Sequence, residues 1–124
     1  MIRWINLGVG SVAGGFARYF LAGFVQQTAG RQFPYGVLVV NLLGCFLIGI
    51  FDTLAEVKLL LSPSARMLLM TGFCGGFTTF SAFMLDTFHL CRDGEMLKAF
   101  GNVSLSVGLG FLLFYLGTLV VRAF

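Results

Sequence analysis

Uncharged apolar residues fill four long stretches of this chain, and nearly all charged residues stand at the ends of these stretches. Three of them hold 20, 19 and 23 residues without a charge and lie between Arg31 and Asp52, Arg66 and Asp86, and Lys98 and Arg122. A fourth runs from Trp4 to about Gln26 and is interrupted only by Arg18. About 20 apolar residues in a helix cross the ~30 Å hydrocarbon core of a bilayer. The pattern predicts an all-α membrane protein, a single domain over residues 1–124 with transmembrane helices at about 3–27, 33–56, 65–90 and 96–122.

The composition indicates a lipid environment rather than an aqueous one. Hydrophobic residues make up 58% of the 124 residues, and charged residues only 10%. Because a soluble domain could not bury that much apolar surface, we expect the lipid bilayer as the surrounding medium. The net charge of +3 is spread without a basic cluster, so nucleic acid is not an expected partner. The three cysteines are isolated, which is typical of small buried hydrophobic residues rather than of a disulfide or metal framework.

The third stretch contains a polar interruption between Gly72 and Phe83, where the sequence reads G-F-C-G-G-F-T-T-F-S-A-F. Its two adjacent glycines, Gly75 and Gly76, weaken a helix, and the hydroxyl residues that follow can compensate the carbonyls that become free. Backbone at membrane depth gives up helical hydrogen bonds only where it is buried in protein or lines a cavity. We therefore predict that the third helix is broken near its middle and that this segment binds or transports a ligand.

Polar side chains in two other stretches could face this interruption. Asn41 lies deep in the second stretch, and it suits a hydrogen bond between helices as well as donation to a desolvated anion. In the fourth stretch, Asn102, Ser106 and Gly110 recur at every fourth residue and therefore share one helix face. Hydroxyl groups in membrane helices commonly bond to their own backbone. We expect a functional role for this stripe only if it faces Asn41 and the hydroxyl groups of the third stretch.

Aromatic rings accompany the hydroxyl groups of the third stretch. Phe80 and Phe83 flank Ser81, and ring edges carry the positive part of the aromatic quadrupole. Ring edges and hydroxyl donors together would solvate an anion without a full positive charge to trap it, and conduction requires such weak binding. For the neighbouring Phe73 and Phe77, packing in the core is an equally good explanation.

Two classes of function lack the residues that they need. No Asp or Glu lies in the middle of any stretch, whereas a proton-coupled exporter of cationic compounds would use a buried carboxylate as its exchange site. The chain has no Ser-His-Asp set, no paired carboxylates and no cofactor-binding run, so we do not expect an enzyme.

A non-transporting assembly subunit, which would need only helix contacts through glycine, is the other alternative.

Positive residues are divided evenly between the two sides of the predicted bundle. Four lie on the side of the termini and four on or towards the other side: Arg3, Lys58, Arg66 and Arg122, against Arg18, Arg31, Arg92 and Lys98. Because the Lys/Arg bias of short loops sets orientation, neither orientation is preferred. We favour insertion both ways up, with two copies pairing as an antiparallel two-fold dimer, over one orientation set by the first helix alone. Arg18 itself either snorkels to the interface or forms a cationic mouth that attracts anions.

Three motifs, in this order along the chain, resemble those of the Fluc (CrcB) fluoride channels. They read G-G-F-A-R-Y at 14–19, N-L-L-G at 41–44 and G-F-C-G-G-F-T-T-F-S-A-F at 72–83. The resemblance implies a passive, fluoride-selective channel that exports fluoride across the bacterial inner (cytoplasmic) membrane. It also implies an antiparallel, dual-topology homodimer with two pores. The residues alone would not distinguish fluoride from another small anion.

The resemblance also implies roles for individual residues. The fluoride path would be lined by ring edges, an amide and hydroxyl groups: Asn41, Thr79, Phe80, Ser81, Phe83, Asn102 and Ser106. Arg18 would lie near a vestibule, and the backbone oxygens of Gly75 and Thr78 from both subunits would hold a structural sodium ion on the dimer axis. The chain departs from the family at Ala82, where many relatives have a hydroxyl residue, and at Asp86, where glutamate is common.

Overall fold

The computed structural model describes all of residues 1–124 and contains only helices and their connections. The elements are α1 (Ile2–Ala29), α2 (Tyr35–Glu56), α3 (Pro63–Arg66), η1 (Met67–Cys74), α4 (Gly75–Phe77), α5 (Phe80–Arg92) and α6 (Met96–Arg122). Four helical segments are long and apolar enough to cross a membrane: Ile2–Ala29, Tyr35–Glu56, Pro63–Arg92 and Met96–Arg122. The prediction of an all-helical chain with four helical segments long and apolar enough to span a membrane is confirmed.

The third span is interrupted near its middle, as the sequence predicts. Thr78 and Thr79 adopt extended backbone conformations, with φ and ψ of −93° and 155° and of −151° and 118°. The two glycines expected to weaken the helix, Gly75 and Gly76, are themselves helical, so the break falls just after them. The segment before it, η1, is wound as a π-helix, a rare form that is frequently found at functional sites.

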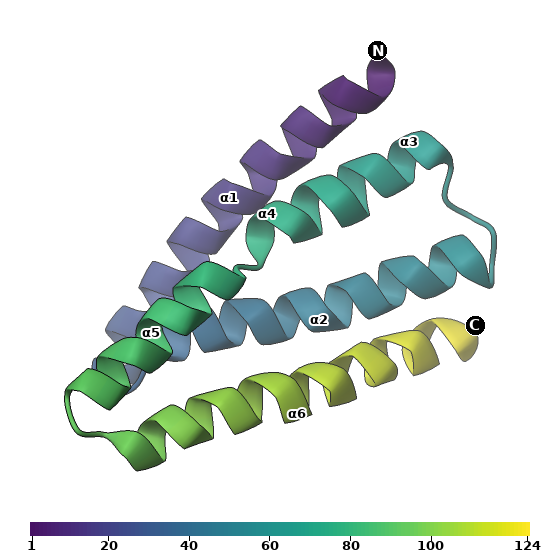
Figure 1. Cartoon of the computed structure of the whole chain (residues 1–124). Helices are drawn as coiled ribbons and strands as arrows, with labels where there is room; N and C mark the ends of the chain where they lie inside the picture. The colour runs from purple at the N-terminus through teal and green to yellow at the C-terminus, as the bar shows by residue number, and fades with distance from the viewer.

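The four spans run back and forth across the bundle (Figure 1). Both termini and the connection from α2 to α3 lie at one end of the molecule, and the α1–α2 and α5–α6 connections lie at the other. Within the bundle, α1 packs against η1 and α4, and α2 packs against α6. The last helical piece of the third span, α5, contacts α6 and, to a smaller extent, α2.

Glycine allows the backbones of α1 and the third span to touch. A Cβ atom added to Gly14 would overlap the carbonyl oxygen of Phe73 and lie 2.9 Å from the amide nitrogen of Phe77. The Cα atom of Gly10 lies 3.0 Å from the position that a Cβ of Gly72 would take. Two pairs of glycines at a spacing of four, Gly10/Gly14 in the first span and Gly72/Gly76 in the third, therefore meet each other inside one chain, where close approach favours van der Waals packing in lipid.

Candidate functional site

A crevice of about 450 Å³ opens beside the helix break, between α2, η1, α5 and α6. We call it the central crevice. It brings together seven residues singled out from the sequence: Asn41, Gly75, Thr78, Thr79, Phe80, Phe83 and Ser106. Three further predicted residues, Arg18, Ser81 and Asn102, are not part of its wall. Sequence reasoning missed the three sulfur-containing wall residues, Met70, Cys74 and Cys45, which look like ordinary apolar residues in their helices.

Asn41 of α2 binds the backbone of the break directly. The Asn41 Nδ2 donates to the carbonyl oxygen of Thr79 at 3.1 Å, and the Thr79 N–H donates to Asn41 Oδ1 at 2.9 Å. In an extended residue the N–H and C=O groups point to the same side, so one carboxamide can pair with both, as a neighbouring strand would. Asn41 thus supplies partners for backbone groups that have left the helical pattern.

The break also releases carbonyl groups on its N-terminal side. In an unbroken α-helix the Thr79 N–H would donate to Gly75, and the Ala82 N–H would donate to Thr78. Here the first donates to Asn41, and the second donates to the Thr79 hydroxyl at 3.3 Å. The carbonyl oxygens of Gly75 and Thr78 are therefore without their α-helical donors, and both residues line the central crevice.

Arg18 reaches the same region from α1. Its Nε donates to the carbonyl oxygen of Gly76 at 3.2 Å, which compensates another carbonyl close to the break. The guanidinium nitrogens at the end of the side chain make no hydrogen bond within the chain. From the sequence we expected Arg18 either to snorkel to the interface or to form a cationic mouth. Neither expectation includes its hydrogen bond to the backbone of another span.

Hydroxyl groups continue from the break into α5. Thr79 is the N-cap of this helix, because its Oγ1 accepts from the N–H of Ala82. The same Oγ1 lies 3.3 Å from Ser81 Oγ, and either hydroxyl can donate. Ser81 is exposed beside the wall of the central crevice, so its hydroxyl extends the polar surface that begins at Thr79.

The two predicted pore phenylalanines lie edge to face at the start of α5. Their ring centroids are 5.8 Å apart and the ring planes meet at 62°. Phe83 is 8% exposed and belongs to the core, whereas Phe80 is 73% exposed although it lines the central crevice. The crevice is therefore open along one side at Phe80.

The polar stripe of the fourth span faces the interior of the chain. Ser106 lines the central crevice, and its Oγ is buried without any hydrogen-bond partner. A buried hydroxyl without a partner is uncommon and marks a place where water or a ligand can bind. Asn102, one turn away, is 2% exposed and donates from Nδ2 to Thr87 Oγ1 at 3.0 Å. Of the two polar side chains in the stripe, Ser106 therefore lines the crevice, and Asn102 joins α6 to α5.

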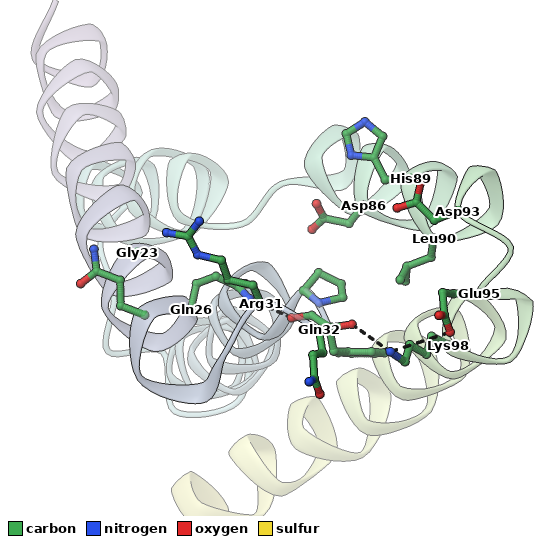
Figure 2. Close-up of a pocket in the computed structure, with 13 residues that line it drawn as sticks. Gly23, Gln26, Arg31, Gln32, Asp86, His89, Leu90, Asp93, Glu95 and Lys98 are labelled. Carbon is green, nitrogen blue, oxygen red and sulfur yellow. Dashed lines mark hydrogen bonds and ion pairs between the residues drawn. The ribbon is translucent and has the colours of Figure 1, made fainter.

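A second, larger cavity of about 650 Å³ lies at the end of the bundle formed by the α1–α2 and α5–α6 connections (Figure 2). Its wall carries six titratable side chains: Arg31, Asp86, His89, Asp93, Glu95 and Lys98. Lys98 Nζ donates to the carbonyl oxygen of Gln32 at 3.3 Å and lies 3.8 Å from Glu95 Oε2. Asp86 extends from α5 towards the interior of this cavity (Figure 2), three residues beyond Phe83 of the central crevice. One face of α5 therefore runs from the central crevice to this second cavity with its charged side chains.

These features define a class of protein. Four spans, an interrupted helix and a crevice with unpaired polar groups at its centre are typical of membrane proteins that conduct or transport small solutes.

Comparison with known sequences identifies the family. Residues 5–118 match the family described as "CrcB-like protein, Camphor Resistance (CrcB)", and the chain belongs to it. A relative from Methylocella silvestris is 47% identical over 97% of this chain and 92% of its own length. Relatives from Chlorobaculum tepidum and Rhizobium etli are 49% and 42% identical, over 94% and 99% of this chain and 91% and 98% of their own lengths. All three are named fluoride-specific ion channel FluC. The family resemblance seen in the motifs is confirmed, and membership in a family of channels confirms that the chain is not an enzyme.

Proposed function

We propose that this chain is a passive, fluoride-selective channel that exports fluoride from the cytoplasm across the bacterial inner membrane. The observation that carries the proposal is the central crevice. Seven residues implied by the family resemblance meet there, beside a helix break in a chain whose relatives are named fluoride channels. The four apolar spans support a multi-pass location in the membrane.

The chemistry of the crevice suits a small anion. The buried Ser106 hydroxyl has no protein partner and is free to donate, and Thr79 lines the same crevice. Phe80 and Phe83 meet the same space, and their ring edges attract an anion without binding it permanently. No carboxylate lines the crevice, so no charged side chain there repels an anion or exchanges protons for a cation.

The flanking polar residues would extend this path. Ser81 adds a hydroxyl next to Thr79, and Asn102 lies one helical turn from Ser106. The free guanidinium nitrogens of Arg18 would attract anions towards a vestibule. The contribution of Asn102 would be small, because its amide already donates to Thr87.

The working unit that we propose is an antiparallel, dual-topology homodimer with two pores. The open side of the central crevice supports it, because Phe80 is 73% exposed and needs another protein surface to close a path around it. The even division of positive residues supports insertion in both orientations. Cysteines introduced singly into the α2–α3 and α5–α6 connections would each be labelled from both sides of the membrane; labelling from one side alone excludes dual insertion.

A structural sodium ion on the dimer axis fits the same proposal. The carbonyl oxygens of Gly75 and Thr78 lack their α-helical donors, and hard oxygen ligands of this kind suit an alkali cation. Two such carbonyls from each of two copies would hold the ion, which would supply fixed positive charge and link the two chains.

Fluoride release from liposomes tests the function. Purified protein is reconstituted in vesicles loaded with fluoride or with chloride, and an ionophore removes the voltage that would stop a passive flux. Release of fluoride without chloride is the expected result. If neither ion moves and a proton gradient instead drives uptake of a cationic dye, the chain is an exporter and the proposal is wrong.

A further inference from the structure

Gly44 of α2 lies where the helix has no room for a side chain. A Cβ atom added to Gly44 would overlap the Cγ2 methyl carbon of Thr78, and it would lie 3.6 Å from Thr78 Cβ and 3.5 Å from Phe77 Cδ2. Because Thr78 Cβ stays at an ordinary distance while the methyl carbon attached to it overlaps, this methyl group points directly at Gly44. The space that glycine leaves open is therefore a socket that the Thr78 methyl group fills.

The direction of this methyl group is fixed within the third span. The Thr78 Oγ1 donates to the carbonyl oxygen of Cys74 at 2.9 Å, one helical turn earlier. A β-branched side chain has few χ1 rotamers, so a bound hydroxyl group also fixes the methyl group. Thr78 is the first residue of the helix break, with an extended backbone and a carbonyl group that has left the helical pattern. The socket therefore holds the residue at which the helix ends.

The face of α2 that meets the break offers two contacts. Asn41 and Gly44 are three residues apart and therefore lie on the same face of the helix. Asn41 pairs with the backbone of Thr79, and Gly44 receives the methyl group of Thr78. Elsewhere α2 packs chiefly against α6 and touches the third span to a smaller extent. The distance between α2 and the break therefore depends on these two contacts, and both Gly44 and Thr78 line the central crevice.

We propose that Gly44 is a positioning residue: its contact with the Thr78 methyl group sets how closely α2 approaches the helix break, and with it the width of the central crevice. Gly44 has no side chain that could bind an ion, so it acts through Thr78 and through the residues that follow the break. The effect on flux rests on the proposed fluoride channel, whereas the effect on stability is independent of any transported ion.

Gly44→Ala tests the contact from the side of α2. Alanine forms helices better than glycine, so the substitution would be neutral or stabilising if the socket were open. With the methyl group in place, the added Cβ pushes the break away from α2. We expect the melting temperature of the purified protein to fall by about 5 °C or more, and fluoride release per folded protein to fall about tenfold.

Thr78→Ser tests the same contact from the side of the break. Serine retains the hydroxyl group that bonds to Cys74 and lacks the methyl group, so it leaves room for the Cβ of Ala at position 44. In the double variant Gly44→Ala/Thr78→Ser, release should recover to within about threefold of the unsubstituted channel, and most of the lost stability should return. Thr78→Ser alone leaves the socket empty and should cost less than Gly44→Ala. If Gly44→Ala yields no folded protein, recovery of folded protein in the double variant replaces the melting temperature as the measurement.

Gly49→Ala is the matched control on the same helix. Its Cβ would overlap the carbonyl oxygen of Phe114 in α6, which is far from the Thr78 methyl group in the contact pattern, so Thr78→Ser should not rescue it. The inference is wrong if Gly44→Ala is as stable as the unsubstituted protein, or if Thr78→Ser rescues neither variant or both equally. Rescue of stability without rescue of release would overturn the positioning role. If the unsubstituted protein releases no fluoride, the proposed function fails, and the stability measurements alone decide whether the contact exists.

Discussion

The two halves of the interrupted third span are held in place by different forces. Before the break, η1 and α4 lie against α1 with backbone touching backbone, as Gly14 and the Phe73 carbonyl show. After it, α5 leaves large apolar side chains uncovered, among them Phe80 at 73% and Phe88 at 61% exposure. The first half is fixed by close packing inside the chain, and the second by hydrogen bonds from Asn41 and Asn102 and by contact with α6.

This difference assigns separate tasks to the halves. Close packing of backbones leaves no room for adjustment, so the first half is suited to present carbonyl groups in a fixed position. The second half carries the aromatic rings and hydroxyl groups that we assign to the pore, and it depends on a neighbouring surface to enclose them. Substitutions in the first half should therefore affect folding, and substitutions in the second should affect flux.

The largest effect on folding is expected from Gly14→Ala, at the contact between α1 and the first half. Its Cβ would overlap the Phe73 carbonyl oxygen, and both backbones belong to rigid helices. Overpacking of this kind destabilises by about 1–3 kcal/mol, which lowers the ratio of folded to unfolded protein by roughly 5- to 150-fold. Size-exclusion chromatography of the detergent-solubilised protein measures the folded yield. The control is Gly15→Ala, where an added Cβ meets nothing within 4 Å, and equal yields of the two variants would contradict the packing argument.

Phe80→Ile should leave folding intact and remove flux. An aliphatic side chain of similar bulk has no positive ring edge, so we expect fluoride release to fall on the order of 100-fold or more. Phe88→Ile is the matched control, because Phe88 is an exposed phenylalanine of the same helix outside the central crevice. Unchanged release in Phe80→Ile, or an equal loss in both variants, would rule out a ring-edge contact with the ion.

Ser106→Ala should reduce flux without reducing stability. The Ser106 hydroxyl makes no hydrogen bond in the chain, so its removal leaves no protein group unpaired. Loss of one neutral donor to an anion corresponds to about 1 kcal/mol, or roughly fivefold in fluoride release. Ser104→Ala, on the exposed side of α6, is the control. A lower melting temperature together with unchanged release would mean that the hydroxyl is structural.

Much of the fold follows from the sequence pattern, because lipid imposes simple rules. Helices must satisfy their own backbone groups, so four apolar stretches predict four spans, and a glycine- and hydroxyl-rich segment predicts an interruption. The resemblance of three motifs to a known family then identified seven of the residues that meet in the central crevice.

The remaining features depend on contacts between distant residues. The break lies at Thr78 and Thr79 rather than at the glycines, because Asn41, 38 residues earlier than Thr79, replaces the lost helical partners. Local propensity contains no information about such a partner. The same holds for Arg18, whose bond to the Gly76 carbonyl spans 58 residues.

The smallest effect is expected at Asn102, which tests how the second half of the third span is held. Its amide donates to Thr87 of α5, and a hydrogen bond between membrane helices contributes only about 0.6 kcal/mol on average. Asn102→Ala and Thr87→Val should each lower thermal stability slightly, and the double variant should lose less than the sum, because both remove the same bond. Fluoride release should stay within about twofold of the unsubstituted protein, since a small loss in helix contact leaves the crevice donors in place. If Asn102→Ala instead lowers release as much as Ser106→Ala does, with no coupling to Thr87, then Asn102 belongs to the ion path. In that case α5 is held by its contact with α6 and by Asn41 alone.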